Sequence, residues 1–276
     1  METLLMKGKP VADKYREAIG AKIALAHSQG KEVTLAIVVV GDDPASHVYK
    51  NRLMKLITSL GGKAKEILLP AQSTEAEVLQ VVEELNKDES ITGILPMMPL
   101  PQHLDDARIG AAVLAAKDVD CLNTSNQGAF LAGHNPWGAS TPRACMAILD
   151  HYGVELTGKR AVVLGRSNVV GKPVALMLLQ KNATVTICHS RTADLAELTK
   201  QADIVVAAIG KPAFVKPEMV REGVVIVDVG INAVGDKLVG DVDPEVMAKA
   251  AAFTPVPGGV GVVSNMMVME ALTRGL

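Results

Sequence analysis

Continuous apolar runs alternate with helical segments along this chain, and this alternation most constrains the fold. The runs at 34–40, 161–164 and 204–209 are apolar at successive positions, as in strands that are covered on both faces. The segments at 45–60 and 170–181 have the composition and spacing of helices. Strands followed by crossover helices lie parallel to one another. The pattern therefore predicts an α/β fold built on parallel sheets.

The alternation occurs in two blocks that are separated by an irregular stretch. Residues 118–138 are rich in Asn and Gly and have little periodicity, so we interpret them as a linker and cleft wall. We expect two α/β domains with a cleft between them, the C-terminal one Rossmann-like with a parallel sheet. The N-terminal domain is expected at 1–139, completed by the C-terminal helix at about 262–276, and the second domain at 140–261.

The composition excludes several classes of function. A net charge of -2 and an aromatic content of 3% provide neither a basic surface nor a stacking platform for nucleic acid. No apolar run is long enough to span a membrane, and the N-terminus lacks the pattern of a signal peptide. The 3 cysteines are widely spaced, and the 6 histidines have no metal-ligand spacing. We therefore expect a cytoplasmic protein without a metal, a disulfide framework or a nucleic-acid or membrane partner.

A turn that contains glycine follows the strand at 161–164 and opens the next helix. It reads G-R-S-N-V-V-G-K-P over residues 165–173. This motif is weak by itself, but a turn between strand and helix is where backbone amides meet the phosphates of a dinucleotide. The turn predicts dinucleotide binding through Gly165, Arg166 and Ser167.

The end of the next strand favours NADP over NAD. A carboxylate there would bind the ribose 2′-hydroxyl of NAD, but residues 188–192 read C-H-S-R-T. Ser190 can donate to a 2′-phosphate, and Arg191 and Arg166 can neutralise it. The alternative is a set of ordinary polar surface residues at a strand end. Gly210 lies at the end of a later strand, where a small residue lets the cofactor approach the backbone.

Three further features are candidates for substrate binding. Tyr49 offers a flat aromatic face and a hydroxyl group, although, taken alone, an ordinary half-buried helical tyrosine explains it better. The K-D-V-D sequence at 117–120 is either a solvated charge cluster or the source of a carboxylate that pairs with N–H groups of a heterocycle. The loop at 255–261 has two prolines and three glycines before a final helix. Such a loop is either an ordinary turn or a stiff site where backbone amides meet a ligand.

Taken together, these segments resemble the methylenetetrahydrofolate dehydrogenase/cyclohydrolase family over nearly the whole chain. The matching motifs, in chain order, are G-D-D-P-A-S at 41–46, G-I-L at 93–95, K-D-V-D at 117–120, the turn at 165–173, D-V-G-I-N at 228–232, G-D-V at 240–242 and P-V-P-G-G-V-G at 255–261. The resemblance implies a folate-binding N-terminal lobe, a Rossmann-like NADP lobe and a homodimer joined through the cofactor lobes. It also implies oxidation of 5,10-methylenetetrahydrofolate to the 5,10-methenyl form, followed in most members by hydrolysis to 10-formyltetrahydrofolate.

The resemblance also implies roles for individual residues. Tyr49 would stack on the aminobenzoyl ring of the folate and Asp120 would bind the pterin, so these two are the candidate catalytic residues. The residues implied to shape the cleft between pterin and nicotinamide are Pro257, Gly258 and Gly259. The residues implied to hold NADP are Gly165, Arg166, Ser167, Ser190 and Ile231.

This chain departs from the family pattern at the positions of the hydrolysis step. Leu53 stands where the family has the lysine of Y-x-x-x-K, and Met97, at the substrate side, stands where it has the supporting glutamine. Neither side chain can transfer a proton, and Lys50 and Lys55 are unconvincing substitutes by spacing. Cys121 replaces the glycine that usually follows Asp120.

We therefore expect an NADP-dependent methylenetetrahydrofolate dehydrogenase with weak or absent cyclohydrolase activity. Two alternatives stay open at this point. One is an NAD(P)-dependent enzyme that acts on a modified pterin or another one-carbon carrier. The other is a non-catalytic folate-binding paralogue.

Overall fold

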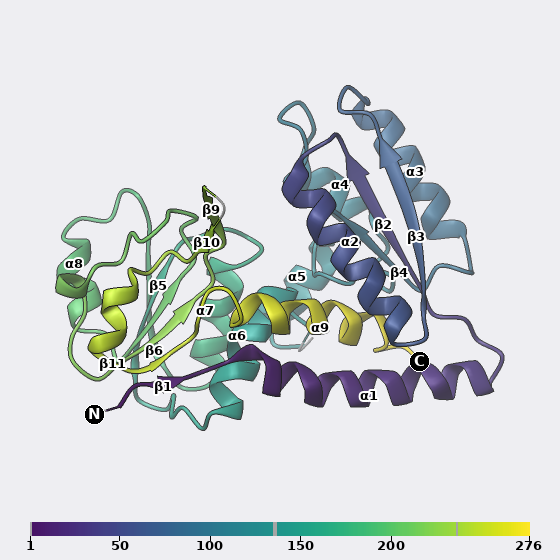
Figure 1. Ribbon diagram of the computed structural model, residues 1–276. Helices are drawn as coiled ribbons and strands as arrows, with labels where there is room; N and C mark the ends of the chain where they lie inside the picture. Colours follow the sequence, from purple (N-terminus) through teal and green to yellow (C-terminus); the bar gives the residue numbers. More distant parts are fainter. Residues whose placement is uncertain (1, 135–136, 236) are drawn as a thin grey trace. The chain divides into compact units, whose positions relative to one another are not determined.

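The chain forms two compact units in the computed structural model, which describes residues 2–134, 137–235 and 237–276 (Figure 1). The first unit consists of the N-terminal segment up to Asp13 and Thr141–Met267; we call it the six-stranded unit. The second consists of Lys14–Ser140 and Val268–Leu276; we call it the three-stranded unit. This division differs from the boundaries expected from the sequence at both ends of the chain.

The three-stranded unit is built on a small parallel sheet in the order β3-β2-β4. All residues of the central strand β2 are buried, which explains its uninterrupted apolar sequence. Alternate residues Ala36, Val38 and Val40 pack with the apolar faces of α3 and α4, while α2 packs against β2 and β3 (Figure 1). The elements of this unit, most of α1 included, are α1 (Gly8–Ser28), β2 (Thr34–Val40), α2 (Pro44–Ser59), β3 (Lys63–Leu69), α3 (Glu75–Lys87), β4 (Gly93–Pro96), α4 (Asp106–Ala112) and α5 (Thr124–Leu131).

The six-stranded unit contains a fully parallel sheet in the order β1-β11-β8-β7-β5-β6. The first strand, β1 (Leu4–Leu5), joins this sheet through β11. For this reason the N-terminal residues group with this unit and not with the sequence that follows them. The other elements, most of α9 included, are α6 (Ser140–His151), β5 (Arg160–Leu164), α7 (Gly171–Gln180), β6 (Thr184–Cys188), α8 (Leu195–Lys200), β7 (Ile204–Ala207), η1 (Pro217–Met219), β8 (Val224–Asp228), the hairpin β9 (Asn232–Val234) and β10 (Lys237–Val239), η2 (Pro244–Ala248), β11 (Ala250–Phe253) and α9 (Val260–Leu272).

The structure confirms the predicted α/β class and the Rossmann-like parallel sheet of the C-terminal block. The interpretation of residues 118–138 as an irregular linker is wrong in part, because α5 lies within them. Asn123 caps this helix: its side-chain oxygen accepts hydrogen bonds from the backbone N–H groups of Ser125 and Asn126, at 2.8 and 3.4 Å. Among the described residues, no helix has the length and apolarity needed to cross a membrane.

Candidate functional site

A pocket of 470 Å³ lies in the six-stranded unit where β5, β6 and β7 end. β5 has β6 on one side and β7 on the other, so the order of the strands reverses at this point. Ligands bind in open α/β sheets at such a switch point, beyond the carboxyl ends of the strands. The pocket is lined by Leu164, Gly165, Arg166, Ser167, Cys188, His189, Ser190, Thr192, Leu195, Ala208, Ile209, Lys211 and Phe214.

The turn after β5 can be formed only with glycine at two positions. Gly165 has a φ of +125°, and a Cβ there would overlap the backbone carbonyl of Ala208. Gly171 begins α7 directly against Gly165, and a Cβ there would overlap the carbonyl of Gly165. The Ser167 hydroxyl accepts a hydrogen bond from the backbone N–H of Val170 at 3.1 Å. The turn therefore brings the start of α7 close to the pocket, as a phosphate site requires.

The polar lining of the pocket is cationic or neutral. Arg166 and Lys211 supply positive charge, and Ser190 and Thr192 supply hydroxyl groups. No Asp or Glu is among the described residues that line it. This composition suits an anionic ligand and lacks the carboxylate that binds a free ribose 2′-hydroxyl.

Sequence reasoning identified only part of this lining. Gly165, Arg166, Ser167 and Ser190 were predicted and line the pocket, whereas the predicted residues Arg191, Gly210 and Ile231 are not among its lining residues. His189, Thr192 and Lys211 were not assigned a role. The sequence could have indicated these three residues, because each lies within two positions of a predicted residue at a strand end.

The loop at 255–261 is fixed by the start of α1 within the same unit. The backbone N–H of Gly8 donates to the carbonyl oxygen of Gly258 at 2.8 Å. A Cβ on Gly8 would overlap the carbonyl of Gly259, and a Cβ on Gly259 would meet that of Pro255. Pro257 and Gly258 are exposed, and Gly259 is buried. The loop is therefore a specific close-packed structure whose tip is accessible.

Asp228 is the last residue of β8, and its side chain is buried, with only 2% exposed. This burial governs its charge state. Its carboxylate accepts hydrogen bonds from the backbone N–H groups of Gly230, Asp241 and Val242, at 3.0, 2.9 and 3.0 Å. Desolvation nevertheless raises the pKa of Asp228 from 3.8 to about 6, and the nearby charge of Asp241 contributes in the same direction.

This raised pKa predicts a stability change between pH 4 and 7. In that range the folded state binds more protons than the unfolded state, so the free energy of unfolding falls as pH rises. The fall contributed by Asp228 is at most about 3 kcal/mol, from about 2 pKa units at about 1.4 kcal/mol each. Urea unfolding of the wild type and Asp228→Asn at pH 4, 5, 6 and 7 measures it. The wild-type value minus the variant value should decrease over this range, and a constant difference would contradict the prediction.

The predicted substrate residues Tyr49, Met97 and Asp120 lie in the three-stranded unit, as does Leu53 at the position of the family lysine, whereas Pro257, Gly258 and Gly259 belong to the six-stranded unit. Tyr49 and Leu53 are one helical turn apart on α2; Tyr49 is half-buried, and Leu53 is fully buried. Met97 follows β4 and is buried, and its backbone N–H donates to the Val38 carbonyl at 2.8 Å. The apolar side chains at positions 53 and 97 are thus both enclosed by protein.

Lys50 does not replace the absent family lysine. Its side chain is buried, and its ammonium group forms an ion pair with Glu66 on β3. Lys55 is exposed on α2. The ammonium group of Lys50 is therefore held at β3 by Glu66.

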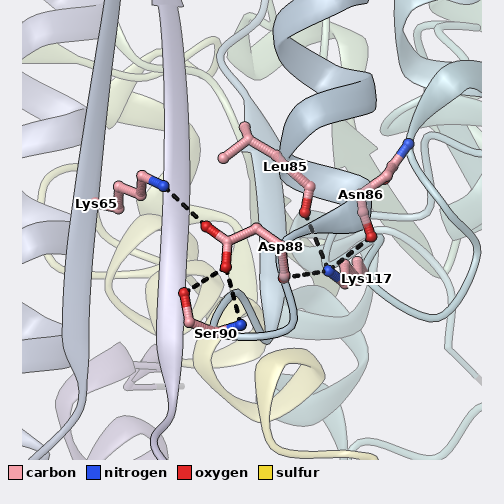
Figure 2. A network of polar contacts seen from close by, with 6 residues as sticks. All are labelled: Lys65, Leu85, Asn86, Asp88, Ser90 and Lys117. Carbon is pink, nitrogen blue, oxygen red and sulfur yellow. Dashed lines mark hydrogen bonds and ion pairs between the residues drawn. The ribbon is translucent and has the colours of Figure 1, made fainter.

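The charges at 117–120 are not a solvated cluster. The Lys117 ammonium donates to the carbonyl oxygens of Leu85, Asn86 and Asp88, at 3.0, 2.9 and 2.7 Å, and so binds the C-terminal end of α3 (Figure 2). Desolvation lowers the pKa of Lys117, and the charges of Asp88 and Glu89 oppose this shift. The carboxylate of Asp88 does not bind Lys117; it accepts hydrogen bonds from the Lys65 ammonium and from the backbone N–H and hydroxyl of Ser90 (Figure 2).

Asp118 shapes the loop that carries Asp120. Its buried carboxylate accepts hydrogen bonds from the backbone N–H groups of Asp120, Leu122 and Asn123, at 3.2, 3.0 and 2.9 Å. Asp120 is half-buried, and its Oδ1 accepts from the backbone N–H of Ser140 at 2.7 Å. Asp120 therefore lies in a loop whose backbone is held by the carboxylate of Asp118.

Replacement of Lys117 by methionine should destabilise the three-stranded unit. The change removes the donor from the carbonyl oxygens of Leu85 and Asn86 and leaves that of Asp88 with only the backbone N–H of Ile91, at a cost of about 1–3 kcal/mol. Urea unfolding measures this cost. Lys65→Met is the matched control, because it removes only an exposed ion pair with Asp88 and should change stability little. Equal effects of the two substitutions would contradict this account.

The six-stranded unit has a parallel sheet with a glycine-containing turn at its switch point, and the chain also forms a second parallel α/β unit. These features define a two-unit dinucleotide-binding α/β protein. Two family models match this chain: "Tetrahydrofolate dehydrogenase/cyclohydrolase, catalytic domain" at residues 6–120, and the NAD(P)-binding domain of the same name at residues 139–275. The chain belongs to the tetrahydrofolate dehydrogenase/cyclohydrolase family.

Individual relatives agree with this assignment. The chain is 44% identical to the bifunctional protein FolD of Moorella thermoacetica, over 98% of this chain and 97% of the relative. The bifunctional FolD structure from Campylobacter jejuni has a TM-score of 0.95 and 39% identity, and the match covers 99% of this chain and 98% of that chain. The Trypanosoma brucei enzyme, solved with NADP and an inhibitor, has a TM-score of 0.94 and 34% identity, with 99% and 96% covered.

Proposed function

We propose that this protein oxidises 5,10-methylenetetrahydrofolate to 5,10-methenyltetrahydrofolate with NADP. The observation that carries the proposal is the pocket at the ends of β5, β6 and β7 in a chain of this family. The residues present fit the cofactor, because the two glycines permit the tight turn between β5 and α7, and cations and hydroxyl groups line the pocket beside it. When bound, NADP supplies the hydride acceptor.

The oxidation step requires little acid–base catalysis by the protein. Loss of hydride from the methylene carbon leaves a cation that is delocalised over two nitrogen atoms, so no proton has to move in that step. The protein has to hold the substrate beside the cofactor in the right orientation. In this proposal Tyr49 stacks on the folate, Asp120 binds the pterin, and Pro257, Gly258 and Gly259 contribute to ligand binding.

NADP is preferred to NAD in this proposal because of the charges around the pocket. Arg166 and Lys211 supply cations, Ser190 supplies a hydrogen-bond donor, and no described lining residue is acidic. A 2′-phosphate therefore finds complementary partners, while a free 2′-hydroxyl finds no carboxylate. The T. brucei relative was solved as a complex with NADP, in agreement with this preference.

Hydrolysis of the methenyl product is weak or absent in this proposal. Attack by water requires a side chain that can transfer a proton. Leu53 and Met97 occupy the two family positions for that chemistry, both are buried, and neither can ionise.

One spectroscopic time course tests the function. The purified protein is mixed with methylenetetrahydrofolate and NADP, and the reduced nicotinamide and the methenyl product are followed separately. We expect both to accumulate in equal amounts. Absence of reduction with either NADP or NAD would overturn the dehydrogenase proposal and favour a different substrate or a non-catalytic role. Loss of the methenyl signal faster than the uncatalysed rate would overturn only the proposed loss of hydrolysis.

We also propose a homodimer that forms through the six-stranded unit. β6 ends that sheet, and Ile187 on β6 is 41% exposed while Leu179 on α7 is 57% exposed. A sheet edge beside exposed apolar side chains is suited to pairing with a second copy. Light scattering after size exclusion should give twice the chain mass for the wild type and a lower mass for Ile187→Lys. A monomeric wild type would contradict the proposal.

The reaction is placed in the cytoplasm in this proposal. The cysteines Cys121, Cys145 and Cys188 are buried and form no disulfide within the described residues, and thiols persist in a reducing compartment. Burial also raises the pKa of Cys145 to about 12, so this thiol stays protonated and unreactive.

A further inference from the structure

One buried carboxylate holds the loop that follows β7. Asp241 is 0% exposed, and its Oδ2 accepts hydrogen bonds from the backbone N–H groups of Ile209 and Gly210, at 2.6 and 2.9 Å. Its Oδ1 accepts from the backbone N–H of Lys211 at 3.0 Å and from the side chain of Asn232 at 2.9 Å. Three successive amides thus point to one carboxylate, which fixes the backbone of the loop in one conformation.

A second buried carboxylate holds Asp241 in turn. Asp228 accepts from the backbone N–H groups of Asp241 and Val242. Two glycines make this close arrangement possible, because a Cβ on Gly230 would overlap the Asp241 carboxylate and one on Gly240 would overlap that of Asp228. The position of the 209–211 loop is therefore determined from the interior of the unit.

This loop contributes two side chains to the cofactor pocket. Ile209 and Lys211 both line it, together with Phe214. The Lys211 ammonium lies 5.9 Å from the centre of the Phe214 ring, a position that favours a cation over the ring face. A cation at this place suits the phosphates of a dinucleotide.

We propose that Asp241 is a positioning residue for dinucleotide binding, which holds the 209–211 backbone in the form from which Ile209 and Lys211 line the pocket. Asp241 does not line the pocket itself, so it acts through the loop and not by contact. The inference rests on the proposed function of this pocket.

The first test is the dissociation constant of NADP for Asp241→Asn, measured by titration calorimetry. The amide NH₂ would face backbone N–H groups that need an acceptor. We expect binding at least about 10-fold weaker than in the wild type, the size of a lost hydrogen bond to a charged group. Asp243→Asn is the matched control: Asp243 pairs with Lys216 at 2.8 Å and makes no bond to the 209–211 loop, so NADP binding should not change.

A double-mutant cycle separates positioning from general damage to the fold. If Asp241 acts through Lys211, Asp241→Asn should weaken NADP binding less in a Lys211→Met background than in the wild type. A merely structural role would give additive effects and would weaken tetrahydrofolate binding as well. Additive effects, or an unchanged dissociation constant in folded Asp241→Asn, would overturn the proposal.

Hydrogen exchange of the wild type answers the same question if Asp241→Asn does not fold. The backbone amides of Ile209, Gly210 and Lys211 should exchange slowly even without NADP, because Asp241 already binds them. Fast exchange of all three in the NADP-free protein would overturn the proposal. A wild type that fails to bind NADP would instead overturn the proposed function, so the two failures are distinguishable.

Discussion

Gly165→Ala should weaken NADP binding by about 10- to 100-fold, the loss expected when a hydrogen bond from the turn to a charged phosphate is removed. A methyl group at this position overlaps the carbonyl of Ala208, so the ends of β5 and β7 would have to separate. Those two strand ends form the switch point of the sheet, and both line the pocket. The change should also reduce the free energy of unfolding by about 2–6 kcal/mol, from overpacking and from the left-handed φ of +125°.

Gly223→Ala is the matched control for this experiment. Gly223 also has a left-handed φ, of +77°, but no atom lies within 4 Å of an added Cβ, and the residue does not line the pocket. The free energy of unfolding of the Gly223→Ala variant should fall by only about 1–2 kcal/mol, and its NADP affinity should not change. Calorimetric titration and urea unfolding of both variants measure the contrast. Equal affinity of Gly165→Ala and the wild type for NADP would show that the ligand does not use this turn.

The second large effect is a gain of activity. The double variant Leu53→Lys, Met97→Gln should hydrolyse methenyltetrahydrofolate at least about 100-fold faster than the wild type, the lower range of general acid–base catalysis. Position 53 lies one turn after Tyr49 on α2, so a lysine there shares the helix face of the tyrosine. The measurement is the decay of the methenyl absorbance, corrected for the uncatalysed rate.

The control for this gain has to reproduce the disturbance of packing. Leu53 is fully buried, so a lysine at this position places a charge inside the protein, and this alone destabilises the three-stranded unit. The variant Leu53→Met, Met97→Gln changes the same two positions without an ionisable group and should show no faster hydrolysis. A folded lysine variant that still oxidises the substrate but hydrolyses no faster would show that other changes, such as that at Cys121, also block this step.

The sequence predicted best the parts whose physical signal is local. β2 and β5 are buried on both faces, so their apolar runs are continuous and indicate parallel strands directly. β1 has two residues, and β11 reads A-A-A-F, so neither carries a strand signal; tertiary pairing alone creates them. Helix α5 has a weak apolar pattern and depends on its Asn123 cap, which is why the stretch resembled a linker.

The candidate site shows the same distinction between local and distant signals. The turn at Gly165 and the acid-free end of β6 are visible in short stretches of sequence, and the pocket contains them. The cation from Lys211 comes from the end of β7, which the sequence marks only through the neighbouring Gly210. That β7 lies beside β5 is visible only in the folded structure. The pairing of Asp228 with Asp241 joins segments that are 13 residues apart and depends on two glycines, so only the folded structure identifies it.

The course of the chain limits how this protein can be recombined with its relatives. The chain passes from one unit to the other after Asp13, after Ser140 and after Met267, and the first and last of these points lie inside α1 and α9. A chimaera that exchanges the whole six-stranded unit therefore needs three junctions, two of them in the middle of helices. A change of cofactor preference in this chain is therefore more readily made by single replacements at strand ends, such as at Ser190, than by exchange of the whole unit.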